Sequence, residues 1–175
     1  MHPSSILNMK KAKDLIDLGH NLTILDVGGR DIGEQDRSYK SLFSDRSKHY
    51  FTADIAEGKG VTHVMPAPYT LPFQDNYFDL VVSGQTLEHV YNPFRLVHEM
   101  KRVLKPNCMI IIIVPSAGYR HDNPDCWRFM DDAFVGIAED CNLEIVHNWV
   151  DRTSYKDRSK QWADNVFIGK KLEQI

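Results

Sequence analysis

Two kinds of hydrophobic pattern alternate along the chain, one with helical spacing and one made of short, continuous apolar runs. Apolar residues recur at helical spacing in residues 6–18 and 96–104, and Asn92-Pro93 is a typical helix start before the second segment. Ser4 or Ser5 is a candidate cap for the first helix, and Gly19 a candidate stop. The apolar runs at 22–29, 49–55, 76–84 and 108–116 are typical of buried strands.

The remaining segments complete an alternating order of helices and strands. Residues 37–44 predict a short helix, residues 60–65 a short strand, and Asp131 or Asp132 begins a helix that ends near Cys141. "LEIVHNWV" and "NVFIGKKL" predict two final strands without a helix between them, which indicates an antiparallel pair. We therefore expect an α/β fold with a seven-stranded, mostly parallel sheet, helices on both faces, and a single domain over residues 1–175.

Ligands of such sheets bind outside the carboxyl ends of the strands, near the point where the strand order changes direction. The chemistry is therefore expected at Gly28, at Asp54, after Met65, between Ser83 and His89, and after Pro115.

Composition narrows the classes of partner. The net charge is −3, with lysine and arginine scattered among acids, so we expect no nucleic-acid partner. The most hydrophobic run, residues 109–114, is too short to cross a bilayer, and residues 1–11 lack the apolar segment of a secretory signal. Three cysteines without a CxxC motif are typical of reduced thiols. These features predict a cytoplasmic protein without a membrane partner.

Four segments carry a family resemblance: "ILDVGGRDIG", "YFTADI", "LPFQDNYFDLVVSGQTLEHV" and "MKRVLKPNCMIIIIVPS". In this order, each at a strand end, they resemble the class I S-adenosylmethionine-dependent methyltransferases, particularly the small type-11-like group. The resemblance extends from Ile24 to about Leu172. It implies a Rossmann-like sheet with an antiparallel last strand and S-adenosylmethionine as the cofactor.

The resemblance also implies roles for individual residues. Asp26 would hold the methionine end of the cofactor, directly or through water, and Gly28 and Gly29 would let the backbone approach it closely. Asp54 would accept hydrogen bonds from the ribose hydroxyls, although a helix cap or turn acid is the alternative reading. The other implied cofactor residues are Ile55, Met65, Ala67, Ser83 and Gln85.

Two departures from the family pattern affect this site. Arg30 stands where a second glycine is usual, and Gly33 follows one position later than the common third glycine. We expect a reshaped loop in which Arg30 points away from the cofactor. "MPAPYT" also lacks the usual acid for the adenine, which leaves adenine recognition to backbone groups near Ala67 and to Met65. A nicotinamide dehydrogenase is disfavoured because "GGRDIG" is not G-x-G-x-x-G.

Two histidines are candidate catalytic residues. Methyl transfer to a hydroxyl oxygen needs a base near the departing proton, and the histidine pKa lies near neutrality. His89 in "SGQTLEHV" and His121 in "PSAGYRHDNPDCWRFMDDAF" both follow strands. The alternative for His89 is that it packs the loop together with Glu88.

No metal is predicted, because Glu88, His89, His121, Asp122 and Asp125 show no defined ligand spacing.

The segment around His121 interleaves polar groups with aromatic rings, which suits carbohydrate. It also resembles the "H..P.D.WRF" segment of methyltransferases that occur with glycan-building enzymes. The alternative is a structural lid in which Trp127 and Phe129 are buried and Arg128 pairs with Asp131 or Asp132. The candidate acceptor-binding residues are Tyr119, His121, Asp122, Trp127 and Arg128.

Together these patterns predict an S-adenosylmethionine-dependent O-methyltransferase that acts on a sugar or glycan hydroxyl. The alternatives are a small-molecule or natural-product methyltransferase and a catalytically inactive binding module. Since the chain has little inserted material to enclose a large acceptor, a partner domain in a larger protein could complete the site.

Overall fold

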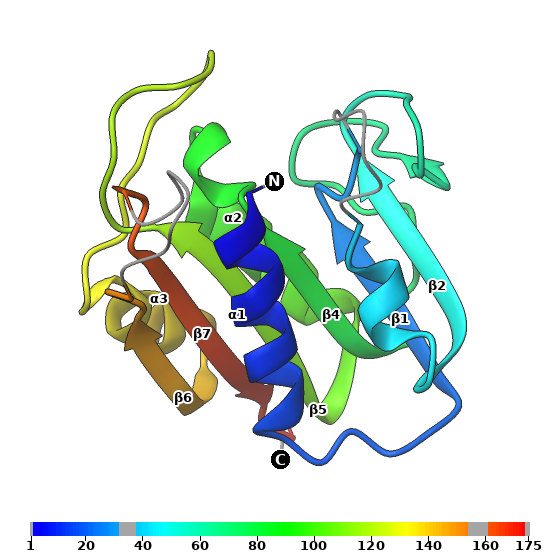
Figure 1. The fold of residues 1–175 in the computed structure, drawn as a ribbon. Coiled ribbons are helices and arrows are strands. Elements are labelled where there is room, and N and C mark those ends of the chain that lie inside the picture. Colours follow the sequence, from blue (N-terminus) through cyan, green and yellow to red (C-terminus); the bar gives the residue numbers. More distant parts are fainter. Residues whose placement is uncertain (1, 32–37, 154–160, 174–175) are drawn as a thin grey trace.

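The structure is a computed structural model that describes residues 2–31, 38–153 and 161–173. Within these residues, a seven-stranded sheet has the order β3-β2-β1-β4-β5-β7-β6 (Figure 1). β7 is antiparallel to both β5 and β6, and the other pairs are parallel. The predicted Rossmann-like α/β sheet with an antiparallel last strand is therefore confirmed. The strands are β1 Leu22–Val27, β2 Ser47–Asp54, β3 His63–Val64, β4 Phe78–Gly84, β5 Leu104–Pro115, β6 Leu143–Val150 and β7 Asp164–Lys171.

Helices cover both faces of the sheet. α1 (Pro3–Asp14) and the 3-10 helix η1 (Tyr39–Phe43) pack on one face, with α1 running across the sheet in Figure 1. α2 (Pro93–Val103) and α3 (Ala133–Cys141) pack on the other. Alternate residues of β5 point to opposite faces, so Ile110 and Ile112 join the α2–α3 core whereas Ile111 and Ile113 join the α1 core. Burial on both faces explains the unbroken apolar run of this strand.

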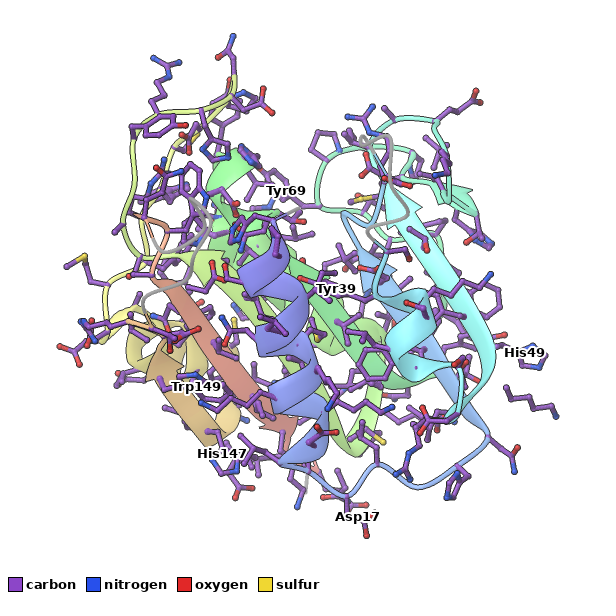
Figure 2. The ribbon with its side chains drawn as sticks, in the orientation of Figure 1. Asp17, Tyr39, His49, Tyr69, His147 and Trp149 are labelled. Atoms are coloured by element: carbon purple, nitrogen blue, oxygen red, sulfur yellow. The ribbon has the colours of Figure 1, made fainter. Side chains whose placement is uncertain are left out.

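The first helix differs from its prediction at both ends. It begins at Pro3 and ends at Asp14, well before Gly19. Ser4 and Ser5 do not cap it but lie buried in its first turn, facing the sheet. The Ser5 hydroxyl is 2.6 Å from the hydroxyl of Tyr39, which lies beside α1 in Figure 2. The stripe that packs on the sheet is therefore partly polar, which the apolar pattern did not indicate.

The second helix begins as predicted and ends earlier than predicted. The Asn92 side chain accepts a hydrogen bond of 3.1 Å from the Arg95 N–H, which confirms the cap. The helix ends at Val103, and β5 starts directly at Leu104, which pairs with Phe78 of β4. The helix therefore ends one residue before the end of the predicted segment 96–104, because strand pairing begins at Leu104. In the described part of the chain, no helix is long and apolar enough to cross a membrane.

Phe134→Ala tests the packing of α3 on the sheet. The Phe134 ring is fully buried and stacks on Phe167 of β7, with ring centroids 4.7 Å apart. Its removal should lower the free energy of unfolding by about 3–5 kcal/mol in urea titrations, because a large cavity is left behind. Val135→Ala, one position along on the exposed side of the helix, is the control. Equal losses for the two variants would contradict this packing.

Candidate active site

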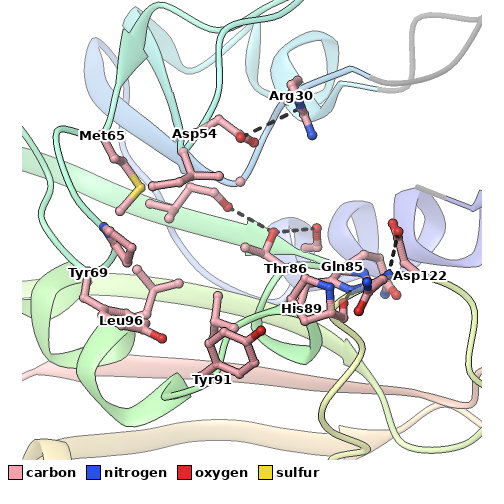
Figure 3. Close-up of a pocket in the computed structure, with 18 of the residues that line it drawn as sticks. Arg30, Asp54, Met65, Tyr69, Gln85, Thr86, His89, Tyr91, Leu96 and Asp122 are labelled. Carbon is pink, nitrogen blue, oxygen red and sulfur yellow. Dashed lines mark hydrogen bonds and ion pairs between the residues drawn. The ribbon is translucent and has the colours of Figure 1, made fainter.

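A cavity of about 720 Å³ opens at the carboxyl ends of the parallel strands, a volume within the range of ligand pockets. Its walls come from the loops that follow β1 to β5, from the beginnings of α1 and α2, and from Trp162 just before β7. Figure 3 shows Arg30 and Asp54 on one side of the cavity and His89 and Asp122 on the other. The site therefore has two chemically different sides.

The turn after β1 is shaped by its glycines. Gly28 has a φ of 77°, and a Cβ at this position would collide with the Thr86 side chain. The Gly28 N–H donates a 2.8 Å hydrogen bond to the Ala53 carbonyl, which joins the turn to β2. A Cβ on Gly29 would lie 2.6 Å from Oδ2 of Asp26. Gly28 lines the cavity, whereas Gly29 packs behind its wall.

Asp26 lies one layer beneath the turn, fully buried. Its Oδ2 accepts a 3.0 Å hydrogen bond from the Tyr50 hydroxyl, while Oδ1 has no hydrogen-bond partner among the described residues. Burial raises the pKa of Asp26 to about 7, and the hydrogen bond from Tyr50 opposes the rise only in part. Asp26 thus has one oxygen without a hydrogen-bond partner among these residues and a carboxyl group that titrates near neutral pH.

Asp54 stands at the end of β2 and lines the cavity. Its Oδ1 accepts a 3.1 Å hydrogen bond from the Ala56 N–H and lies 3.8 Å from Nε of Arg30. The expectation that Arg30 points away is therefore wrong: Arg30 also lines the cavity, and its side chain packs against Gly58, where a Cβ would lie 2.6 Å from Cδ. Gly33 lies outside the described residues.

The side of the cavity beside Asp54 is largely apolar. Ile55 and Met65 line it as expected from the strand ends, together with Tyr69. Ala67 lies off the wall and is exposed, and its carbonyl accepts a 3.2 Å hydrogen bond from the Thr70 N–H.

The end of β4 holds the floor of the cavity in place. Ser83 is fully buried behind the wall, where its hydroxyl donates a 2.8 Å hydrogen bond to the Val27 carbonyl of β1. Gln85 lines the cavity with a φ of 57°, and its amide donates a 3.1 Å hydrogen bond to Asp164.

The structure brings the two candidate catalytic histidines together. The His89 and His121 ring centroids are 5.0 Å apart, and Nε2 of His89 lies 3.6 Å from Oε1 of Glu88. Glu88 is 0% exposed, and burial raises the pKa of its carboxyl group to about 8. Burial also lowers the pKa of His121, and the nearby Asp125 carboxylate opposes this. The result is a compact group of three titratable side chains at one end of the cavity.

Only some of the candidate acceptor-binding residues in the segment after β5 line the cavity. His121 and Asp122 line the wall, whereas Tyr119, Trp127 and Arg128 do not. Arg128 forms a two-pronged ion pair with Asp125 at 2.6 and 2.8 Å, so the predicted pairing with Asp131 or Asp132 is wrong.

The lid alternative holds for Phe129, which is buried, but not for Trp127, which is 40% exposed. The Trp127 indole N–H instead donates a 2.8 Å hydrogen bond to the Val90 carbonyl.

His2 and Trp162 are cavity residues that the sequence patterns did not single out as a pair. Their rings stack with centroids 5.7 Å apart, and Trp162 also contacts the His121 ring at 4.7 Å. His2 lies 3.5 Å from the buried Asp164 carboxylate at the start of β7. Because this contact joins the two ends of the described chain, no local motif indicates it.

A family model described as a methyltransferase domain matches residues 20–112, which is more than half of the chain. The chain therefore belongs to this family, and its sheet is that of the class I S-adenosylmethionine-dependent methyltransferases. S-adenosylmethionine is the cofactor of the class.

Curated relatives are similar over part of their length. A methyltransferase from Mycolicibacterium gilvum is 31% identical over 103 residues, which cover 53% of this chain and 38% of the relative. A protein from Methanocaldococcus jannaschii is 40% identical over 60 residues, which cover 34% of this chain and 29% of the relative. The chain spans less than half the length of these relatives.

Solved structures share the fold over nearly the whole chain. An S-adenosylmethionine-dependent methyltransferase from Aquifex aeolicus has a TM-score of 0.62 at 18% identity, covering 97% of this chain and 98% of its own. The 1,6-didemethyltoxoflavin-N1-methyltransferase from Burkholderia thailandensis, with its acceptor and S-adenosylhomocysteine bound, has a TM-score of 0.70 at 14% identity. That match covers 97% of this chain and 80% of the neighbour.

The residues present fit this cofactor. Gly28 has no side chain, so a ligand can come close to the backbone of the cavity wall. Asp54 presents a carboxylate at the end of β2, and Asp26 has a buried oxygen beneath the turn without a hydrogen-bond partner in the described part of the chain. When bound, S-adenosylmethionine supplies a methyl group on a cationic sulfur.

Asp26→Asn should change how stability depends on pH. The pKa of Asp26 is raised in the folded state, so the folded state holds this proton more tightly than the unfolded chain does. Its contribution to stability is therefore largest below pH 4 and is lost as the pH rises to about 7. Relative to the wild type, the asparagine variant should gain on the order of 4 kcal/mol in free energy of unfolding across this range. Urea titrations at a series of pH values measure the difference, and a difference independent of pH would contradict the assignment.

Proposed function

We propose that this chain transfers the methyl group of S-adenosylmethionine to a hydroxyl oxygen of a sugar or glycan. The observation that carries the proposal is one cavity with Asp54 on one side and His89 on the other (Figure 3), where His89 is grouped with Glu88 and His121. The first side suits the cofactor and the second suits an acceptor that must lose a proton.

On the cofactor side, Asp54 would accept hydrogen bonds from the ribose diol, and the apolar surface of Ile55 and Met65 would cover the adenine. Gly28 would give the backbone close approach to the methionine part, above the unpartnered oxygen of Asp26. Arg30 would then lie beside the ribose rather than away from it, because its Nε lies 3.8 Å from the same Asp54 carboxylate that would bind the ribose.

On the acceptor side, the hydroxyl proton has to leave as the methyl group arrives. The His89 Nδ1 lies 2.7 Å from the Pro124 carbonyl, so Nδ1 carries the hydrogen and Nε2 keeps the lone pair. Burial lowers the pKa of His121, which favours the unprotonated form of its ring. Either imidazole can therefore accept the proton directly, while the oxygen–methyl bond forms and the sulfur–methyl bond breaks.

The surroundings of the histidines support a carbohydrate acceptor. Asp122 and Asn123 line the cavity and offer hydrogen-bonding groups to hydroxyls. Tyr91, also on the wall, is 77% exposed, and Tyr119 and Trp127 expose their rings nearby on the segments that follow β4 and β5. Sugar rings stack on such exposed aromatic faces.

A small-molecule acceptor is the second candidate, because the Burkholderia thailandensis neighbour binds a small heterocycle in the same fold. The chain also spans less than half of its curated relatives, so a partner domain that completes the acceptor site is part of the proposal. A chain that binds the cofactor without transferring methyl groups would be a binding module instead.

Calorimetric titration with S-adenosylmethionine and with S-adenosylhomocysteine tests the first half of the proposal, and binding of both is expected. Methyl transfer is then measured against a panel of free sugars, nucleotide sugars and oligosaccharides. Binding without transfer to any sugar, together with transfer to a small heterocycle, would favour the small-molecule alternative. The absence of binding to either cofactor form would overturn the enzyme assignment.

Asp54→Asn should weaken cofactor binding by at least about tenfold, because hydrogen bonds to a charged acceptor are among the strongest in proteins. Arg30→Ala, on the same wall, is the matched comparison. Its ion pair with Asp54 is long and partly exposed, so its loss should change affinity by less than about fivefold. The two dissociation constants are measured by calorimetry, and a larger loss for Arg30→Ala would contradict the role of Asp54.

His121→Asn and His89→Ala should lower kcat by about 10²- to 10⁴-fold, since each removes a group that promotes loss of the hydroxyl proton. Calorimetric affinity for S-adenosylhomocysteine should change by less than about twofold, because His89 lies across the cavity from Asp54 (Figure 3) and the His121 ring adjoins His89. His98→Ala, at an exposed position on α2, is the control and should retain wild-type turnover. Full activity in both cavity variants would contradict the acceptor-side assignment.

A further inference from the structure

We infer that Glu88, His89 and His121 bind a divalent transition-metal ion at the acceptor end of the cavity. One ligand atom from each of the three side chains lies within 4.8 Å of the others. His89 and His121 line the cavity, and Glu88 lies directly behind them. The binding site stands on its own geometry, whereas its part in methyl transfer rests on the proposed function.

Glu88 is the strongest indication of a cation-binding site. Its side chain is completely buried, and neither carboxylate oxygen has a hydrogen-bond partner among the described residues. A buried carboxylate without partners is costly, and native structures satisfy such groups with hydrogen bonds, counter-charges or metal ions. Nε2 of His89, the nearest basic atom, lies 3.6 Å from Oε1. An ion bound between these groups would give the buried oxygens of Glu88 the partner that they lack among the described residues.

Both imidazoles are held in the way that metal-binding histidines are held. Metal ligands of this type usually donate the N–H of the other ring nitrogen to a carbonyl or a carboxylate. Nδ1 of His89 lies 2.7 Å from the Pro124 carbonyl, and Nδ1 of His121 lies 3.2 Å from Oδ2 of Asp125. Both arrangements leave Nε2 with the lone pair needed to bind an ion. Asp125 is itself fixed by its two-pronged ion pair with Arg128.

The backbone keeps the ligands in place although they come from distant segments of the chain. Glu88 and His89 belong to the 3-10 helix η2 (Leu87–His89), which follows β4, and His121 belongs to the segment after β5. The Cys126 N–H donates a 2.7 Å hydrogen bond to the Glu88 carbonyl. With the bond from Trp127 to Val90, this joins the two segments side by side. These hydrogen bonds therefore fix the positions of the segments that carry Glu88, His89 and His121 relative to each other.

The donor set selects the class of ion. Two imidazoles and one carboxylate suit zinc, manganese, iron or cobalt rather than magnesium or calcium, which prefer oxygen ligands. Ligand atoms around a tetrahedral zinc ion lie about 3.3 Å apart, so zinc binding would draw the three side chains together by up to about 1.5 Å. Three protein ligands leave at least one position open, as catalytic sites do.

An ion in this place would change how the acceptor is activated. With both Nε2 atoms bound, the imidazoles are ligands rather than bases, and an acceptor hydroxyl on the open position has a lowered pKa. The hydroxyl would lose its proton to water, the oxygen would take the methyl group, and the neutral thioether would leave. No oxidant or reductant is required.

The test is zinc binding by the full chain, prepared without an affinity tag and treated with a chelator that is then removed. Calorimetric titration with Zn²⁺ alone, and Co²⁺ absorption spectra, should show one ion per chain with nitrogen and oxygen ligands. Glu88→Gln and His121→Asn should each weaken zinc binding by more than about 100-fold. Asp125→Asn, which removes only the support of His121, should weaken it by about 10- to 100-fold.

A second group offers a matched control. His98, Asp140 and Cys141 also place ligand atoms within 4.8 Å of one another, but His98 and Asp140 are exposed and form an ordinary 2.9 Å pair. Asp140→Asn should leave zinc affinity unchanged. Thermal unfolding of each variant without zinc shows whether it folds. Zinc binding that survives in folded Glu88→Gln, or that Asp140→Asn abolishes, would overturn the site.

The metal site and the proposed function can fail separately. Methyl transfer that persists after chelation but is lost in His121→Asn would leave the proposed function intact, with histidine as the base, and would overturn the role of the ion. Stoichiometric zinc binding without any binding of S-adenosylmethionine would support the site and overturn the proposed function.

Discussion

The parallel pairing of β1 with β4 is the constraint on which the cavity depends. Val27 lies opposite Ser83 in this pair, and the Ser83 hydroxyl bonds to the Val27 carbonyl at 2.8 Å. The two strands therefore end level with each other, and Gly28 and Gln85 face the same opening. The strand order changes direction here, since β2 and β3 lie on one side and β5 on the other, which leaves a crevice between the loops. Pairing of β2 with β1 adds Asp54 at the same level.

The antiparallel β7 completes the site from the other end of the chain. Its first residue, Asp164, pairs with Pro115 and is buried, which raises the pKa of its carboxyl group. Ser4, Asn8 and Gln85 all donate hydrogen bonds to this carboxyl group at 3.0–3.2 Å. One buried acid therefore joins α1, β4 and β7, and this polar network explains why the buried stripe of α1 contains serine and asparagine. It also holds the beginning of α1 against the sheet, and with it the side of the cavity that contains His2 and His121.

Much of the sheet could be predicted from the sequence because a buried strand needs an apolar run, and the run in β5 is unmistakable. Helix ends were predicted less well, since strand pairing at Leu104 and burial of Ser4 depend on distant partners. The strand-end positions of the site followed from topology alone. The position of Arg30 and the meeting of His89 with His121 did not, because loop hydrogen bonds rather than local patterns bring these side chains together.

The most direct test is a crystal structure of the chain with S-adenosylhomocysteine. The assignment predicts the ribose hydroxyls on the Asp54 carboxylate and the sulfur atom facing His89 and His121 across the open part of the cavity. In this placement the methyl donor would occupy the side of the cavity beside β2, and the acceptor would occupy the side beside the histidines. An adenosine group bound among the histidines, or a ligand bound outside the cavity, would contradict it.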